Sequence, residues 1–207
     1  MDEVYIEIES EIEIIKSYAK TQQTVILAKM LRTKQQFLKL NYITHLNNNW
    51  KIIFRRINLK LQACYYIQTN LMGAQIAYSP IFGPENFCLI KYTNHFFNRY
   101  KKRTKIQLTS IDKIIYNFFK SNFDIKIGNS TYESNGTRHT RIISHEGVGF
   151  GFTSPSKLLI SLQTFLPHED LTESQIEIMA FLKDNIDELK SIKDPYPLRE
   201  IPNTYKF

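Results

Sequence analysis

Acidic side chains are nearly missing from the middle of this 207-residue chain. Residues 14–105 contain sixteen Lys and Arg but a single acid, Glu85, whereas residues 1–13 contain six acids and no base, and residues 106–207 contain eleven bases and thirteen acids. The three segments therefore carry formal charges of about −6, +15 and −2, which sum to the net +7 of the chain. A long block of one sign attracts polyanions through phosphate contacts and counterion release. We therefore expect RNA or another polyanion as a partner; the alternative is a well-solvated basic surface.

Cysteine, glycine and proline are also scarce. The chain has two Cys (Cys64 and Cys88), seven Gly and seven Pro. Cysteines so far apart form neither a CxxC motif nor a disulfide framework, which favours a reducing, cytoplasmic location. The low Gly and Pro content argues against long low-complexity linkers. No run of about 18 apolar residues is present, and the acidic first residues lack the basic and apolar parts of a signal peptide, so we expect neither a membrane span nor a leader.

The first 80 residues have the periodicity of helices. Residues 4–19 fit either an amphipathic helix or an alternating strand, and we favour the helix. Residues 22–42 have the composition of a helix, and residues 50–71 repeat apolar side chains at helical spacing. Three consecutive Asn predict a break at residues 45–50. We therefore predict a basic helical N-terminal region over residues 1–80.

Residues 81–192 predict an α+β domain, followed by an irregular, Pro-containing tail at 193–207. Its expected elements are a strand at 86–92, helices at 93–103 and 109–123, a mostly polar loop at 124–140 with a short strand at 125–128 as an alternative within it, a β-turn at 145–147, a strand at 157–167 and a closing helix at 171–190. The fold class predicted is two helices packed on a small antiparallel meander, with a C-terminal helix. Gly149 and Gly151 share one face of a strand, which is unfavourable unless something approaches closely.

The stretch "TNHFFNRYKKRTK", residues 93–105, concentrates cations without any acid. Thr93 or Asn94 is a suitable N-cap, so a helix would begin there. At about 100° per residue, His95, Arg99 and Arg103 lie one turn below another on one face. Three aromatic side chains fill the adjacent face and can anchor the helix in a core: Phe96, Phe97 and Tyr100.

This column of side chains can hold an anion. Stacked cations repel one another, and an anion between them relieves that repulsion. The helix dipole disfavours a charged histidine in the first turn, so the neutral form of His95 is favoured. A neutral imidazole beside two guanidiniums could act as a general base next to a phosphate clamp. The alternative is a solvated basic helix with a histidine in its first turn.

The strand, the H-x-x-x-R-x-x-x-R helix, the second helix and a meander whose last strand carries Thr164 resemble the barnase/EndoU/RelE-like superfamily of small ribonuclease domains, over about residues 86–182. The resemblance implies two helices on a curved antiparallel sheet, no cofactor, and RNA cleavage by attack of the 2′-hydroxyl on the adjacent phosphate. It implies His95 as the base, and Arg99 and Arg103 as groups that stabilise the phosphate. Thr164 would hydrogen-bond the substrate or orient a partner. Such a protein would be a toxin or defence component.

Other side chains are weaker candidates. His145, at the expected turn, is the candidate general acid, or simply an exposed histidine. His139 and His145 lack the further ligands that a metal site needs, so no metal is expected. The candidate nucleic-acid contacts outside the column are Lys101, Lys102, Arg55, Arg56 and Lys60. Two other functions stay open: a nucleic-acid-binding protein without catalysis, and an interaction module whose basic face receives an acidic partner such as a cognate inhibitor.

Overall fold

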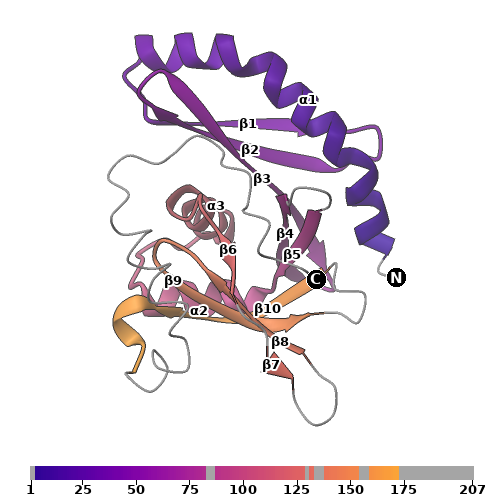
Figure 1. Ribbon diagram of the computed structural model, residues 1–207, viewed down its shortest axis with the longest axis vertical. Coiled ribbons are helices and arrows are strands. Elements are labelled where there is room, and N and C mark those ends of the chain that lie inside the picture. The colour runs from indigo at the N-terminus through magenta and orange to yellow at the C-terminus, as the bar shows by residue number, and fades with distance from the viewer. Residues whose placement is uncertain (1–2, 83–86, 129–130, 133–137, 154–158, 173–207) are drawn as a thin grey trace.

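The structure is a computed structural model that describes residues 3–82, 87–128, 131–132, 138–153 and 159–172. The chain begins with a long helix, α1 (Glu3–Arg32), and continues into β1 (Phe37–Ile43), β2 (Asn49–Ile57), β3 (Lys60–Leu71), β4 (Ala74–Phe82) and β5 (Phe87–Tyr92). Then come α2 (Asn94–Arg103), α3 (Ile111–Ser121), β6 (Lys126–Ile127), β7 (Thr131–Tyr132), β8 (Arg138–Ile143), β9 (Gly147–Thr153), β10 (Leu159–Pro167) and a 3-10 turn, η1 (His168–Asp170). Figure 1 shows α1 along one side of the molecule and α2 on the opposite side.

The ten strands found in the described residues belong to one mixed sheet. The strand order is β1-β2-β3-β4-β5-β10-β9-β8-β6, and β7 pairs with β8. Every pairing is antiparallel except that of β5 with β10, which is parallel. β10 therefore joins the four N-terminal hairpin strands and β5 to the meander formed by the C-terminal strands.

The predicted fold class is wrong, because the N-terminal region adds four strands to a large sheet. Residues 50–71 form the hairpin of β2 and β3 rather than a helix, with Asn58 at a positive φ of 52° in the turn. Ile53 and Tyr66 enter one core while Ile52 and Ile67 enter the core on the other face. A strand that is buried on both faces has apolar residues at nearly every position, and such a run imitates helical spacing.

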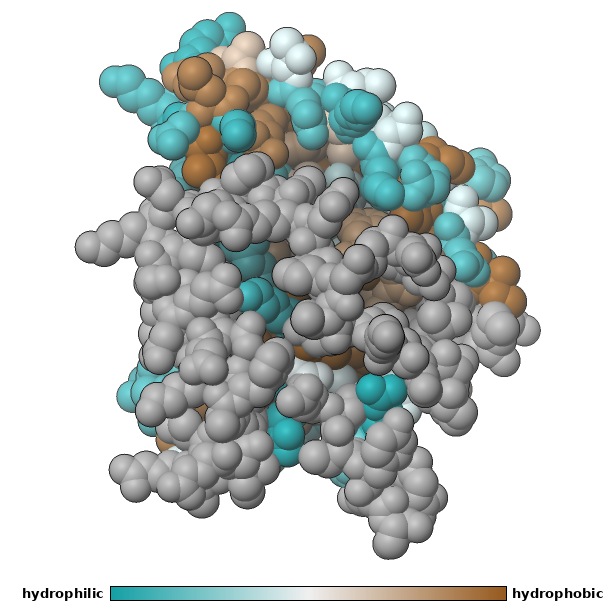
Figure 2. Space-filling model, viewed as in Figure 1, coloured by the Kyte–Doolittle hydropathy of each residue, from teal (hydrophilic) through white to brown (hydrophobic). Residues whose placement is uncertain are grey.

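The first helix is correctly predicted at residues 4–19, but the helix predicted at 22–42 ends early. α1 ends at Arg32, and after a short turn that includes Lys34 at a positive φ of 56°, β1 begins at Phe37. Six apolar side chains of α1 repeat every three, four or seven residues and face β1–β4: Ile8, Ile12, Ile15, Ala19, Ile26 and Met30. The outward side of α1 mixes charged residues with exposed Ile6, Ile14, Val25 and Leu31, and Figure 2 shows hydrophilic and hydrophobic atoms interspersed there.

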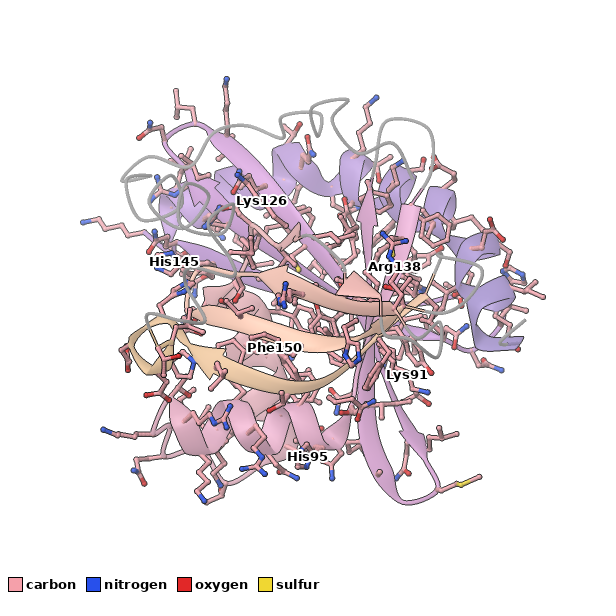
Figure 3. The ribbon with its side chains drawn as sticks, turned by 60° about the horizontal axis from the view of Figure 1, so that its bottom comes forward. Lys91, His95, Lys126, Arg138, His145 and Phe150 are labelled. Carbon is pink, nitrogen blue, oxygen red and sulfur yellow. The ribbon has the colours of Figure 1, made fainter. Side chains whose placement is uncertain are left out.

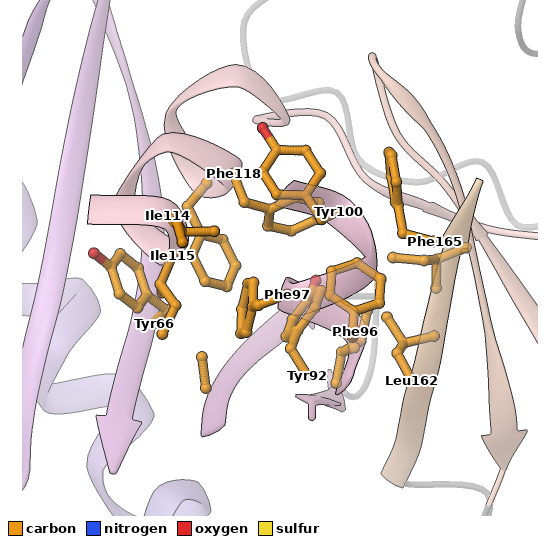
Figure 4. Close-up of a cluster of buried hydrophobic side chains, with 14 of the residues drawn as sticks. Tyr66, Tyr92, Phe96, Phe97, Tyr100, Ile114, Ile115, Phe118, Leu162 and Phe165 are labelled. Carbon is orange, nitrogen blue, oxygen red and sulfur yellow. The ribbon is translucent and has the colours of Figure 1, made fainter. Parts of the chain in front are cut away.

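The second core lies on the other face of the sheet, under α2 and α3. Phe118 sits at its centre, with its ring 5.1–6.2 Å from those of Tyr92, Phe96, Phe97, Tyr100, Phe119 and Phe165. Figure 4 shows these rings clustered between the two helices and the strands. Buried residues of β2, β3, β4, β5, β8 and β10 contribute to this core together with those of α2 and α3.

Most elements predicted within residues 86–167 agree with the structure, but the loop predicted at 124–140 contains β6, β7 and the start of β8, and only the alternative of a short strand at 125–128 fits β6. The predicted strand at 86–92 is β5, the helices are α2 and α3, and the turn at 145–147 joins β8 to β9. The predicted helix at 171–190 extends beyond the described residues, and the tail at 193–207 lies wholly outside them. The predicted boundary at residue 80 falls inside β4, and the sheet continues across it. None of the helices described is long and apolar enough to cross a membrane.

Candidate functional site

Helix α2 is fixed at its first residue to strand β10. Thr93 is the N-cap, and its Oγ1 accepts a hydrogen bond from the backbone N–H of Phe96 (3.2 Å). The same hydroxyl donates to the backbone carbonyl of Leu162 (2.9 Å). One side chain therefore begins the helix and ties it to the sheet, which confirms the predicted cap. His95 consequently lies in the first turn.

The aromatic face of α2 is fully buried, as its pattern predicts. Phe96, Phe97 and Tyr100 have no exposed surface. Such an anchor restricts the rotation of the helix and so fixes the direction of its solvent-facing side chains. His95, on the side away from the core, is exposed, and Arg99 is half-buried.

His95 and Arg99 form a hydrogen-bonded pair. The Nε of Arg99 donates to the Nε2 of His95 at 3.3 Å. The pair therefore holds an imidazole nitrogen within hydrogen-bond distance of a permanent cation.

Arg103 makes a hydrogen bond that ties α2 to β10. Its Nη1 donates to the backbone carbonyl of Phe165, sixty-two residues away on β10. Each step of four residues turns a helix by about 40°, so Arg103 lies about 80° round from His95, at the margin of the buried face. Lys102 lies within about 20° of His95 and is exposed, whereas Lys101 is half-buried. The exposed cluster on α2 is thus His95, Arg99 and Lys102, which we name the α2 cluster.

Thr164 and His145 lie on other parts of the molecule. Thr164 pairs with Phe150 of β9, and its neighbour Phe165 points into the core under α2, so Thr164 faces the opposite side of the sheet. His145 is exposed in the β8–β9 turn. Figure 3 shows His95 and His145 on separate parts of the surface.

The basic residues of β2 are held by contacts within the protein. Arg55 donates to Gln62, forms an ion pair with Asp124 (2.8 Å) and lies over the ring of Phe123. Arg56 donates to the backbone carbonyls of Gln35 and Asn58. Lys60, which begins β3, is exposed. These contacts give Arg55 and Arg56 structural roles that the sequence did not indicate.

A polar network that sequence reasoning missed ties the β8–β9 turn to both helices. The Glu146 carboxylate accepts hydrogen bonds from the Tyr100 hydroxyl (2.7 Å) and the Asn122 side chain (2.8 Å). The Asn122 amide oxygen accepts in turn from the backbone N–H of Glu146 (2.9 Å). Burial, and next the Glu146 charge, raise the pKa of Tyr100 well above its usual range, so the phenol stays a donor. No single-sequence signal links residues this far apart.

Gly149 and Gly151 lie where other parts of this protein approach too closely to leave space for a side chain. A Cβ on Gly149 would lie 2.7 Å from Ile142 and 3.1 Å from the ring of Phe96. A Cβ on Gly151 would lie 2.0 Å from the backbone oxygen of Ser161. The close approach that these glycines require is therefore that of the core and of β10.

Other chemistries find little support in these residues. Burial raises the pKa of the Cys64 and Cys88 thiols to about 12, so both stay protonated at neutral pH and are poor nucleophiles. Across the described ranges, no three His, Cys, Asp or Glu side chains gather as a metal site would require.

No protein-family model, curated protein or solved structure matches this chain. The resemblance to the ribonuclease superfamily therefore stays a prediction.

Proposed function

We propose that this protein is an RNA-binding, metal-independent endoribonuclease whose reacting groups are in the α2 cluster. The observation that carries the proposal is the hydrogen bond from Arg99 to His95. It presents an accepting ring nitrogen beside a guanidinium, on a helix anchored by Phe96, Phe97 and Tyr100. A base and a phosphate-binding cation at adjacent positions are what transphosphorylation of RNA needs.

The reaction would proceed as follows. The phosphate of the bound RNA attracts the Arg99 guanidinium, which leaves the Nε2 of His95 free for the 2′-hydroxyl. His95 takes the 2′-proton as the 2′-oxygen forms a bond to phosphorus and the bond to the 5′-oxygen breaks. Arg99 and Lys102 stabilise the charge on the phosphate oxygens, and the departing 5′-oxygen takes a proton from water. The products are a 2′,3′-cyclic phosphate and a 5′-hydroxyl.

RNA binding without cleavage is the second candidate. The hydrogen bond of Arg103 to Phe165 favours it, because it leaves one guanidinium rather than two beside His95. Both candidates place RNA at α2. They differ in whether His95 is needed for binding or for chemistry.

The test is an incubation of the full chain with labelled single-stranded RNA in the presence of a chelator. We expect cleavage with a 2′,3′-cyclic end, detected by mass spectrometry. His95→Ala should lower the rate by about 10²- to 10⁴-fold, as expected for loss of a general base. Arg99→Ala should lower it by about 10²- to 10³-fold, and Asn98→Ala, an exposed change on the same helix, should be neutral.

The control substrate carries a 2′-deoxy sugar at every position and should stay intact. Equal cleavage by His95→Ala and the unmodified protein would contradict the assignment of His95 and indicate a contaminating nuclease. Retained binding without cleavage by any form would leave the second candidate as the function.

A further inference from the structure

Two rows of side chains cross the C-terminal strands on the face of the sheet that points away from α2. In one row, Arg141 of β8 pairs with Phe150 of β9, which pairs with Thr164 of β10. In the second row, His139 pairs with Phe152, and Phe152 pairs with Ser161. Residues directly opposite each other in a sheet point to the same side, so each row forms a line of neighbours. We name these two rows, together with Lys91, the outer rows.

The second row continues to β5. Ser161 pairs with Lys91 of β5 across the parallel ladder, and Lys91 comes two residues before the N-cap Thr93. A residue adds at most about 3.6 Å of chain, so His95 lies within about 15 Å of Lys91. The outer rows therefore end close to the α2 cluster.

Two phenylalanines occupy alternate positions on the outer side of β9. Phe152 is 41% exposed and Phe150 is half-buried, although the core lies on the other face. Alternate residues of a strand are about 6.6–6.8 Å apart, which spaces the rings for separate contacts. The ring of His139 lies 4.8 Å from that of Phe152 and is tilted by 55° to it, which adds a third ring to this part of the surface. In RNA-binding domains built on a sheet, exposed aromatic rings on the sheet surface stack on unpaired bases.

The charge of the outer rows suits the same ligand. Arg141 and Lys91 lie at opposite ends of the two rows, with the phenylalanines between them. The paired positions of these rows contain no Asp or Glu. Cations flanking aromatic rings are the pattern of a surface that holds a single strand by its phosphates and its bases.

We propose that the outer rows bind single-stranded RNA, with bases stacked on Phe150 and Phe152 and phosphates at Arg141 and Lys91. The strand would lie across β8, β9 and β10 and leave at Lys91 toward His95. The choice of RNA rather than DNA rests on the proposed function. The surface itself is independent of cleavage, because none of its residues takes part in the reaction.

The test measures binding without chemistry. The full chain with His95→Ala is titrated against a fluorescein-labelled uridine oligomer of about twelve nucleotides, and anisotropy is recorded at several salt concentrations. Phe152→Ala should weaken binding by about 5- to 150-fold, because one stacked base is lost. Phe152→Tyr, which keeps the ring, should bind as the parent does. Arg141→Met should lower the slope of log affinity against log salt by about 0.7, the value for one phosphate contact on a single strand.

Matched controls separate this surface from general effects. Val25→Ala removes an exposed apolar side chain from α1, and Lys20→Met removes an exposed charge from the same helix, and both should leave binding unchanged. Thermal unfolding of each variant checks that the fold is kept. Unchanged affinity of folded Phe152→Ala would overturn the proposal. Equal affinity for the deoxy oligomer would overturn the choice of RNA.

The two proposals can fail separately. If RNA binding depends on Phe152 but the protein never cleaves RNA, the proposed nuclease activity is refuted and the proposed binding surface is retained. Cleavage that depends on His95, together with binding indifferent to Phe150 and Phe152, would remove the outer rows and leave the nuclease.

Discussion

The two halves of the sheet are covered differently by the described helices. Strands β1–β3 lie between α1 on one face and α3 on the other, with Trp50 and Phe54 buried toward α1 and Tyr66 stacked on Phe119 of α3. Strands β8–β10 pack their inner face on α2, through Phe165 and Ile142, and carry half-buried or exposed polar and aromatic groups on the other. In the first half, helices therefore cover both faces of the sheet. In the second half, a helix covers only the inner face.

The cations of the two halves follow the same division. In the first half, Arg55 donates a hydrogen bond to Gln62 and forms an ion pair with Asp124. Lys39 lies over the ring of Tyr116. In the second half, Arg141 of β8 stands in a row with Phe150 and Thr164, while Lys91 of the neighbouring β5 lies over the ring of Tyr78. A high density of Lys and Arg in sequence therefore locates a binding surface poorly, because many of these side chains satisfy the fold.

The largest expected effect comes from a comparison of two phenylalanines, Phe118 in the core under α2 and α3 and Phe152 on the outer side of β9. Phe118→Ala should lower the free energy of unfolding by about 3–5 kcal/mol, because it leaves a cavity among six aromatic rings. Phe152→Ala should lower it by about 1 kcal/mol, since this residue is already 41% exposed. Urea unfolding of both variants measures the contrast, and similar losses would show that the outer face is packed like the core.

An alkaline titration tests how dry the inner face is. Burial raises the pKa of the Cys88 thiol from 9.0 to about 12. The folded state therefore keeps a proton that the unfolded state loses, so stability is full below about pH 9 and falls as the pH rises toward 12. Each such group should cost about 1.4 kcal/mol per pH unit in that window. Urea unfolding between pH 8 and about 10.5 should show this slope, and Cys88→Ala should reduce it. An unaltered slope would place the thiol in contact with water.

The smallest expected effect concerns Arg55 in the covered half. Arg55→Met should lower the free energy of unfolding by about 1 kcal/mol, because the ion pair with partly exposed Asp124 and the stacking on Phe123 are lost. The same variant should bind RNA as the parent protein does. A loss of affinity comparable to that of Arg141→Met would erase the distinction between the two halves.

The sequence predicted those elements whose signals are local. The N-cap Thr93, the aromatic face of α2, the apolar face of α3 and the turn at Glu146-Gly147 depend on residues a few positions apart. The hairpin of β2 and β3 could not be separated from a helix, because burial on both faces removes the alternation that marks a strand. Within the site, the spacing of His95 and Arg99 predicted their contact. The diversion of Arg103 to Phe165 depends on where β10 lies, and no local pattern contains that position.

The parallel pairing of β5 with β10 also sets an order of assembly. Strands β1–β5 are joined by short turns and can pair as they leave the ribosome, whereas β10 begins sixty-seven residues after β5 ends (159 − 92). Pairing of strands that are far apart in sequence is slow, because the long loop between them must close before the strands can meet, and closing it costs entropy. Until then β5 presents an open strand edge with Leu89 and Ile90, the type of edge that recruits other chains. We therefore expect a stage during synthesis in which β1–β5 are paired while the edge of β5 is still exposed, and early docking of α2 and α3 would shorten that stage.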